Sequence, residues 1–151
     1  MKLSDIKFEV FTSEPGLDTL YKRIKNNELA TIRYEGEKEW GINMQSELIE
    51  SFYCGLPIPP IYVYQSKRLG IKYEVIDGRE RIRTIRKFFD NELRLNLPDF
   101  GDSTHDLNNK KYSDLLENSE KLLLDNAALR IYYIESDKDI TDHLRKIYQW
   151  Q

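Results

Sequence analysis

One stretch decides the fold of this chain: Tyr73-Glu74-Val75-Ile76-Asp77-Gly78-Arg79-Glu80-Arg81-Ile82-Arg83-Thr84-Ile85-Arg86. An apolar, β-branched segment ends at Asp77-Gly78, and a helical pattern rich in arginine begins directly after it. The pattern predicts a strand over 72–76, a tight turn and a helix over 78–89. The start of a helix presents free backbone N–H groups to an anion. We therefore expect any activity of the chain to lie at this turn.

The side chains around this turn suit phosphate and metal ions. Arginine supplies forked donors that match phosphate, and Asp77 and Glu80 could hold a metal ion or orient a water molecule. Since Arg79, Arg81 and Arg83 follow one another at intervals of two residues, they cannot share one helical face. At least one of them must point toward the strand ends, where it finds an acidic partner or a ligand.

The same residues have a purely structural interpretation. Asp77 would cap the helix, and Gly78 would relieve the backbone of the turn. Glu80 would pair with Arg83 on a solvated helix face, which stabilises a helix by only a few tenths of a kcal/mol. Arg83 and its basic neighbours would then lie largely away from the apolar face of the helix.

Composition limits the class of protein. The chain has 151 residues, of which 40% are hydrophobic and 32% charged, as expected for one folded domain. No apolar run approaches the ~20 residues of a membrane span, and the N-terminus lacks a signal-peptide core. The single cysteine, Cys54, allows no internal disulfide and no zinc cluster, which favours a cytoplasmic setting. We expect Cys54 to be a buried packing thiol rather than a nucleophile.

Charge is unevenly distributed. The net charge is −3, which argues against indiscriminate binding of nucleic acid. Residues 67–87, however, carry eight Lys or Arg against three acidic residues, so that segment is +5 and the remainder −8. A local basic site on an acidic body fits a compact anion such as a nucleotide better than a long duplex.

The rest of the chain predicts an α+β fold in one domain, with a small mixed sheet packed against helices. The strands at 61–64 and 72–76 are expected to pair in antiparallel fashion. Further helices and strands are predicted from periodicity and turn residues: helices over 13–27, 43–55, 113–116 (with 122–124 as an extension) and 139–150, and strands over 29–34, 93–95 and 128–135.

A second cluster consists of Arg33 and Tyr34 with Trp40 nearby. An arginine beside aromatic rings can stack on a base or bind a phosphate, although the two rings could simply cover the edge of the core. His105 and His143 are isolated from partners at metal-binding spacing, so we expect surface or structural roles for both.

Three blocks of sequence, in this order, carry a family resemblance: Arg33-Tyr34 with Trp40 and then 47–52, Gly55-Leu56-Pro57-Ile58-Pro59-Pro60-Ile61-Tyr62, and 75–85. They resemble the N-terminal domain family of GmrSD-type, modification-dependent restriction systems, relatives of the ParB/sulfiredoxin-like fold. The resemblance implies a single ParB-like domain over 1–151 and a role in DNA restriction or phage defence.

The third block in that family usually reads Asp-Gly-Gln-Gln-Arg and is associated with binding and hydrolysis of a nucleoside triphosphate. Asp77, Gly78 and Arg81 match this DGQQR pattern, whereas Arg79 and Glu80 replace the two glutamines. The glutamine that often precedes the first-block arginine is absent as well. The resemblance therefore implies nucleotide binding and gives weaker grounds for hydrolysis.

The expected site follows from the matched positions. Asp77 and Glu80 are the candidate catalytic residues and the candidate ligands of Mg²⁺ accompanying a nucleoside triphosphate. The candidate phosphate-binding residues come from the turn and from the first block: Arg33, Gly78, Arg79 and Arg81.

Two other functions stay open at this point. The arginine-rich helix could contact DNA phosphates in a non-enzymatic module, or the chain could be an interaction scaffold with a degenerate nucleotide site. Relatives continue into a longer helical region that often leads to an HNH-type nuclease, and this chain has no HNH motif. The chain is then either truncated, which an exposed Trp150 would favour, or a minimal protein that works with a partner nuclease.

Overall fold

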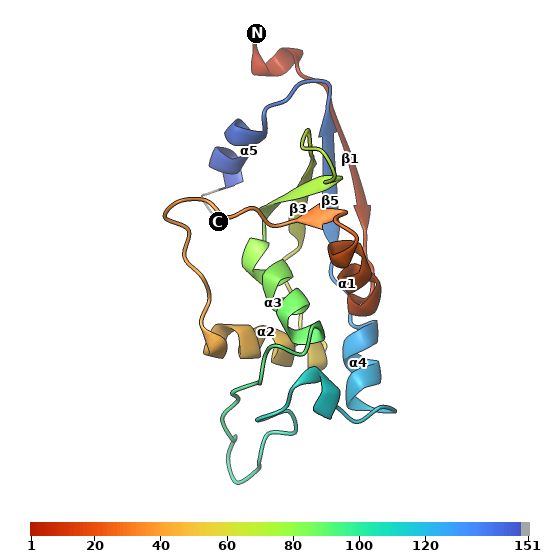
Figure 1. The fold of residues 1–151 in the computed structure, drawn as a ribbon, viewed down its shortest axis with the longest axis vertical. Coiled ribbons are helices and arrows are strands. Elements are labelled where there is room, and N and C mark those ends of the chain that lie inside the picture. The colour runs from red at the N-terminus through yellow and green to blue at the C-terminus, as the bar shows by residue number, and fades with distance from the viewer. Residues whose placement is uncertain (149–151) are drawn as a thin grey trace.

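The computed structural model describes residues 1–148, which form a five-stranded sheet flanked by helices (Figure 1). The strand order is β1-β5-β3-β4-β2. Both β1–β5 and β3–β4 are antiparallel, whereas β3–β5 and β2–β4 are parallel, so the sheet is mixed. The predicted α+β class is confirmed, and so is the antiparallel pairing predicted for the strands at 61–64 and 72–76. The strand bounds are β1 Phe8–Ser13, β2 Leu29–Ala30, β3 Ile61–Gln65, β4 Tyr73–Asp77 and β5 Ile131–Ser136.

Five α-helices and two short 3₁₀ turns complete the fold: α1 Leu17–Lys25, α2 Ile42–Tyr53, α3 Arg79–Phe89, α4 Glu120–Asn126, α5 Thr141–Ile147, η1 Leu3–Asp5 and η2 Tyr112–Asp114. None of these helices is long and apolar enough to cross a membrane. Helices α1 to α4 supply buried side chains to one large core, whereas α5 lies apart from them (Figure 1).

Side chains of the central strands alternate between two cores, because successive residues of a strand point to opposite faces of a sheet. Val63 and Val75 join the large core beneath α1 to α4. Tyr64 and Ile76 point the other way and pack with Leu144 of α5. The sheet is therefore covered on both faces near β4, and α5 is the element that covers the second face.

The predicted strand, turn and helix are all present. Four of the five residues of β4 are buried, as expected for a strand between two neighbours. Gly78 has φ +99°, a left-handed conformation that favours glycine, and serves as the N-cap of α3. Asp77 closes β4, and no side chain caps α3 by a hydrogen bond, so the capping role predicted for Asp77 is wrong.

Several predicted element bounds are wrong, mainly where distant partners decide the outcome. Ser13 does not start a helix but ends β1, an edge strand that local pattern missed because its pairing partner β5 lies more than a hundred residues away. Helix α1 begins after Gly16. The strand expected over 29–34 shrinks to Leu29–Ala30, because only these residues pair with β4.

The second half of the chain brings further corrections. Residues 93–95 form no strand, although Leu93 and Leu95 are buried in alternation with exposed neighbours. The region predicted as one short helix is divided between η2 and α4. Cys54 is exposed rather than buried, because it follows the last turn of α2 as its C-cap. Helix α5 ends at Ile147, and Trp150 lies outside the described residues.

Candidate functional site

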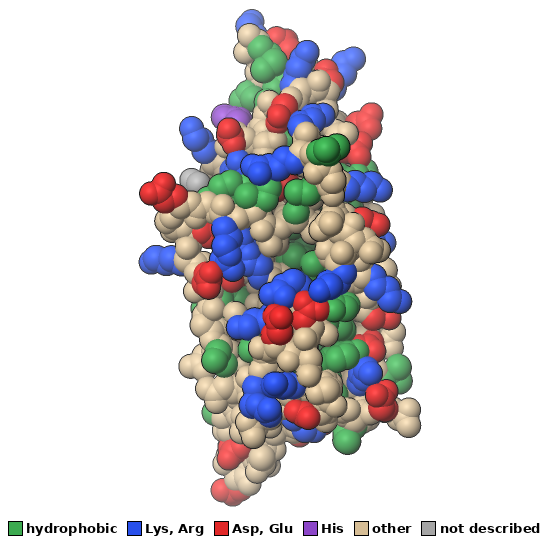
Figure 2. Space-filling view, viewed as in Figure 1, with side chains coloured by type: hydrophobic (Ala, Val, Ile, Leu, Met, Phe, Trp, Pro, Cys, Tyr) green, Lys and Arg blue, Asp and Glu red, His purple; other side chains and the backbone are tan. Residues whose placement is uncertain are grey.

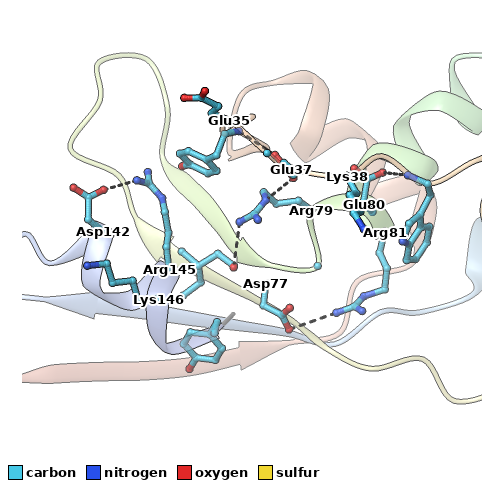
Figure 3. A pocket seen from close by; sticks show the side chains of 16 residues that line it. Glu35, Glu37, Lys38, Asp77, Arg79, Glu80, Arg81, Asp142, Arg145 and Lys146 are labelled. Atoms are coloured by element: carbon cyan, nitrogen blue, oxygen red, sulfur yellow. Dashed lines mark hydrogen bonds and ion pairs between the residues drawn. The ribbon is translucent and has the colours of Figure 1, made fainter. Parts of the chain in front are cut away.

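A cleft of about 650 Å³ lies where β4 turns into α3 (Figure 3). Its walls come from the loop before α2, the end of β4, the first turn of α3, and α5 with Tyr148. The charged lining residues are five basic and five acidic ones: Lys38, Arg79, Arg81, Arg145, Lys146, Glu35, Glu37, Asp77, Glu80 and Asp142. The cleft is thus balanced in formal charge. Residues 67–87 contribute two basic and two acidic side chains to its lining, so the surplus positive charge of that segment lies outside the cleft.

Asp77 and Arg81 face each other across the floor of the cleft (Figure 3). Their charged atoms are 3.7 Å apart, and each side chain is 15% exposed. Arg81 also donates through Nη2 to the carbonyl oxygen of Pro60 at 3.0 Å. The arginine that was expected to point toward the strand ends is therefore Arg81.

This pair leaves buried polar atoms unsatisfied. Oδ2 of Asp77 and Nε of Arg81 are buried without a hydrogen-bond partner among the described residues. Burial raises the pKa of the Asp77 carboxyl above its usual range, and the nearby positive charge of Arg81 and then Arg79 offsets only part of that effect. Burial likewise lowers the pKa of Arg81. Because native proteins rarely leave buried polar groups unpaired, this pair is the best candidate for contact with a ligand.

Glu37, which the sequence did not single out, is the acid that holds the other two arginines. Its Oε1 accepts from Arg79 Nε at 2.8 Å and from Arg83 Nη1 at 2.6 Å. Its Oε2 accepts from the backbone N–H of Tyr34 at 3.1 Å. Although burial by itself would raise the pKa of Glu37, the hydrogen bonds from Arg83 and Arg79 lower it to about 2. Glu37 is therefore charged at neutral pH.

Arg83 was expected on the exposed side of α3, and this prediction is wrong. Its side chain is only 9% exposed, and it pairs with the carboxylates of Glu37 and Glu80. A signal for this arrangement was present, since Arg79 and Arg83 are four residues apart and share one face of the helix. The sequence did not reveal which acid would meet them.

Glu80 is fully engaged within the protein. Its Oε1 accepts from Arg83 at 2.8 Å, so the predicted Glu80–Arg83 pair is confirmed, although its side chain is only 13% exposed rather than solvated. Its Oε2 accepts from the backbone N–H of Trp40 at 3.3 Å. Glu80 thus ties the end of the loop to α3 and leaves no carboxylate oxygen without a donor.

One known family matches most of the chain. The family described as "GmrSD restriction endonuclease, N-terminal domain" matches residues 18–150. The chain belongs to the GmrSD N-terminal domain family. No curated protein and no solved structure matches the chain. The family is one of restriction endonucleases, so this domain is a component of a restriction system. The matched range includes every segment that lines the cleft.

The first-block residues of this GmrSD-family domain separate in space. Tyr34 and Trp40 line the cleft, whereas Arg33 does not. Arg33 instead forms an ion pair through Nη1 with Oε1 of Glu39 at 2.7 Å, and its side chain is about half exposed. The structure therefore brings together Asp77, Gly78, Arg79, Glu80 and Arg81 of the expected site, and it leaves Arg33 outside.

Helix α5 contributes an arginine that no local pattern could indicate. The guanidinium of Arg145 lies 4.2 Å from the centre of the Tyr34 ring, and that of Arg79 lies 5.3 Å from it. Arg145 also pairs with the buried carboxylate of Glu74, which accepts a hydrogen bond from the Tyr34 hydroxyl. These contacts fix α5 and the loop against β4.

The metal expected at this site has one donor that fits. Oδ2 of Asp77 accepts no hydrogen bond from the described residues and suits a hard cation, whereas the hydrogen-bonded oxygens of Glu80 do not. Within residues 1–148, no group of three or more His, Cys, Asp or Glu side chains is placed to hold a metal ion. His105, for which the sequence predicted a surface or structural role, pairs with Glu50 at 2.6 Å, a structural contact.

Proposed function

We propose that this domain binds a nucleoside triphosphate together with Mg²⁺ in the cleft, as part of a restriction system directed against phage DNA. The observation that carries the proposal is the buried, under-satisfied pair of Asp77 and Arg81 in the wall of the cleft. Small-molecule sites are typically clefts of ~300–1,000 Å³ with a few converging polar groups, and this cleft falls in that range.

The phosphates would lie against the turn between β4 and α3. Gly78 has no side chain there, and α3 has no side-chain cap, so its first N–H groups are open to an anion. Arg81 supplies a buried positive charge, and Lys38 and Lys146 add two exposed ones. Trp40 supplies aromatic surface against which a base can pack.

Magnesium supports the same proposal, because it is commonly held by one or two carboxylates together with substrate phosphates. Asp77 would supply the carboxylate. The cation would neutralise charge on the phosphates and on Asp77, whose ionised form is disfavoured by burial. Charge balance in the cleft also favours a ligand that arrives with its own cation over a bare polyanion.

We propose that the domain binds the nucleoside triphosphate, and we do not propose that it hydrolyses it. A general base must have an oxygen within hydrogen-bonding reach of the proton that it takes. Both oxygens of Glu80 accept hydrogen bonds from Arg83 and Trp40, so Glu80 is poorly placed for the catalytic role expected from the sequence.

Thermal unfolding in the presence of nucleotides tests the proposal. A triphosphate with Mg²⁺ at 100 times its dissociation constant should stabilise the wild type by ~2.7 kcal/mol and raise its melting temperature. Asp77→Asn and Arg81→Lys should each reduce this rise, and the double variant Asp77→Ala/Arg81→Ala should abolish it. Arg94→Ala removes an exposed arginine outside the cleft and should keep the full rise.

Each variant must first show a cooperative transition without ligand, so that loss of binding is not confused with loss of folding. The conservative variants serve this purpose if the double variant unfolds. No rise with ATP, GTP, CTP or UTP at millimolar concentration would end the proposal.

DNA binding gains less support from the molecule. On the face seen in Figure 2, acidic side chains lie among the basic ones rather than leaving a continuous basic surface. The same melting experiments, run beside DNA titrations at two salt concentrations, separate the two functions. A steep fall of DNA affinity with salt, without any nucleotide effect, would favour the DNA-binding module.

A further inference from the structure

Glu37 lies in a cradle of three donor groups that come from two different segments. Arg79 and Arg83 extend from one face of α3, and the backbone N–H of Tyr34 completes the set. Figure 3 shows the contact between Arg79 and Glu37. Guanidinium groups bind carboxylate and phosphate with the same forked geometry. The cradle is therefore a general oxyanion site, and a side chain of the protein itself fills it.

The segment that carries Glu37 can move without unfolding the core. Residues 31–41 form no helix or strand, and Glu35, Gly36 and Lys38 around it are exposed. The segment is attached on either side of Glu37, by the Tyr34 hydroxyl to Glu74 and by the Trp40 N–H to Glu80. Between these attachments, Gly36 has φ +81° and no neighbouring atom within 4 Å of the position of a Cβ. Glu37 can thus leave the cradle while Tyr34 and Trp40 stay in place.

Arg79 and Arg83 differ from Arg81 in how fully their hydrogen-bond donors are occupied. Arg79 and Arg83 are satisfied by carboxylates, whereas Arg81 keeps an unpartnered Nε. Arg81 therefore keeps a donor without a hydrogen-bond partner beside Asp77, whereas Arg79 and Arg83 are held by Glu37.

We propose that Arg79, Arg83 and the Tyr34 N–H form an oxyanion subsite that Glu37 occupies in the unliganded protein, and that a phosphate group of the ligand displaces Glu37 to bind there. The inference rests on the proposed function for the identity of the ligand. Glu37 is then an internal competitor that lowers the apparent affinity of the domain for phosphate. Withdrawal of Glu37 would free the guanidinium of Arg79 and leave Arg83 paired with Glu80 alone.

The size of the effect follows from a population argument. If only a tenth or less of the molecules hold the cradle open, the apparent affinity is reduced by about tenfold or more. Glu37→Gln removes the charge and keeps an oxygen that can accept a hydrogen bond. This variant should bind phosphate-bearing ligands about tenfold more tightly than the wild type.

Glu35→Gln is the matched control. Glu35 lies in the same loop and lines the same cleft, but it is exposed and forms no ion pair with any residue in 1–148. Both substitutions remove one negative charge from the cleft. We expect Glu35→Gln to change affinity by no more than about twofold, because an exposed charge is screened by solvent.

The experiment is a calorimetric titration of wild type, Glu37→Gln and Glu35→Gln with Mg²⁺–ATP, Mg²⁺–GTP and inorganic pyrophosphate. Tighter binding by Glu37→Gln than by Glu35→Gln supports the subsite. Equal gains in affinity in both variants would mean that removing any negative charge from the cleft has the same effect, and would overturn the subsite. Weaker binding by Glu37→Gln would also overturn it, because Glu37 would then be orienting the arginines for the ligand.

The ligands distinguish this inference from the proposed function. If pyrophosphate binds more tightly to Glu37→Gln while no nucleotide binds any of the proteins, the oxyanion subsite stands and the nucleotide proposal fails. If Mg²⁺–nucleotide binds wild type and Glu37→Gln equally well, the nucleotide proposal stands and the displacement of Glu37 fails. Absence of all binding would contradict both.

Discussion

Replacement of Gly78 by alanine is expected to destabilise the fold by about 3 kcal/mol or more, through backbone strain and overpacking together. Gly78 has φ +99°, which an L side chain rarely adopts. An added Cβ would also lie well inside van der Waals contact of Ile61 Cγ2 and 2.9 Å from Arg81 Nη2. Ile61 is completely buried in β3 and cannot move aside cheaply.

Substitutions at two other glycines distinguish the effect of backbone strain from that of overpacking. Gly36 has φ +81° but no atom within 4 Å of an added Cβ, so Gly36→Ala should cost about 1 kcal/mol from strain alone. Gly41 has neither a positive φ nor a close neighbour, so Gly41→Ala should be nearly neutral. Free energies of unfolding from denaturant titration measure all three. Equal losses for Gly78→Ala and Gly36→Ala would contradict the close approach of β3 to the turn.

Removal of Arg145 is expected to cost about 3–5 kcal/mol, because it leaves the charge of Glu74 buried without its cationic partner. The Glu74 side chain is 3% exposed, and Arg145 and the Tyr34 hydroxyl are its contacts. Loss of this pair should also free α5 from β4. The measurement is again the free energy of unfolding, for Arg145→Ala against the wild type.

An exposed ion pair provides the control. Arg130 pairs with Glu14 at 3.2 Å, and both side chains are more than half exposed. Arg130→Ala should therefore lower the free energy of unfolding far less than Arg145→Ala does, because solvent screens an exposed ion pair. The double variant Glu74→Met/Arg145→Met should recover much of the loss, because no uncompensated charge remains. Similar costs for Arg145→Ala and Arg130→Ala would show that α5 is not held by this pair.

Local sequence predicted the centre of the fold well. The stretch around Asp77-Gly78 carries a local signal for each of its elements: an apolar run for β4, a glycine for the left-handed turn, and apolar residues at helical spacing for α3. Central strands and amphipathic helices depend mainly on such short-range patterns. The resemblance to the GmrSD-type family is confirmed by the family match over residues 18–150.

The electrostatics of the cleft depend on distant residues and could not be predicted in the same way. Glu37 is more than forty residues from the arginines that it holds, and Arg145 is 71 residues from Glu74. Ion pairs between distant segments leave no periodicity in a sequence. The edge strand β1 was missed for the same reason, since its partner β5 comes near the end of the chain.

Arg79 and Glu80, the two residues that depart from the DGQQR pattern implied by the resemblance, both form internal ion pairs. Arg79 binds Glu37, and Glu80 binds Arg83. Both residues thus belong to a network in which arginines of α3 pair with carboxylates of the same chain, and under our proposal access to Arg79 and Arg83 would depend on Glu37.

Backbone hydrogen exchange with and without Mg²⁺–ATP or Mg²⁺–GTP tests most directly the claim that the turn between β4 and α3 is a triphosphate site. We expect slower exchange at residues 77–82 and a change at residues 34–40, with α4 unaffected because it lies away from the cleft. Unchanged exchange at residues 77–82 under either nucleotide, or protection confined to α4, would contradict it.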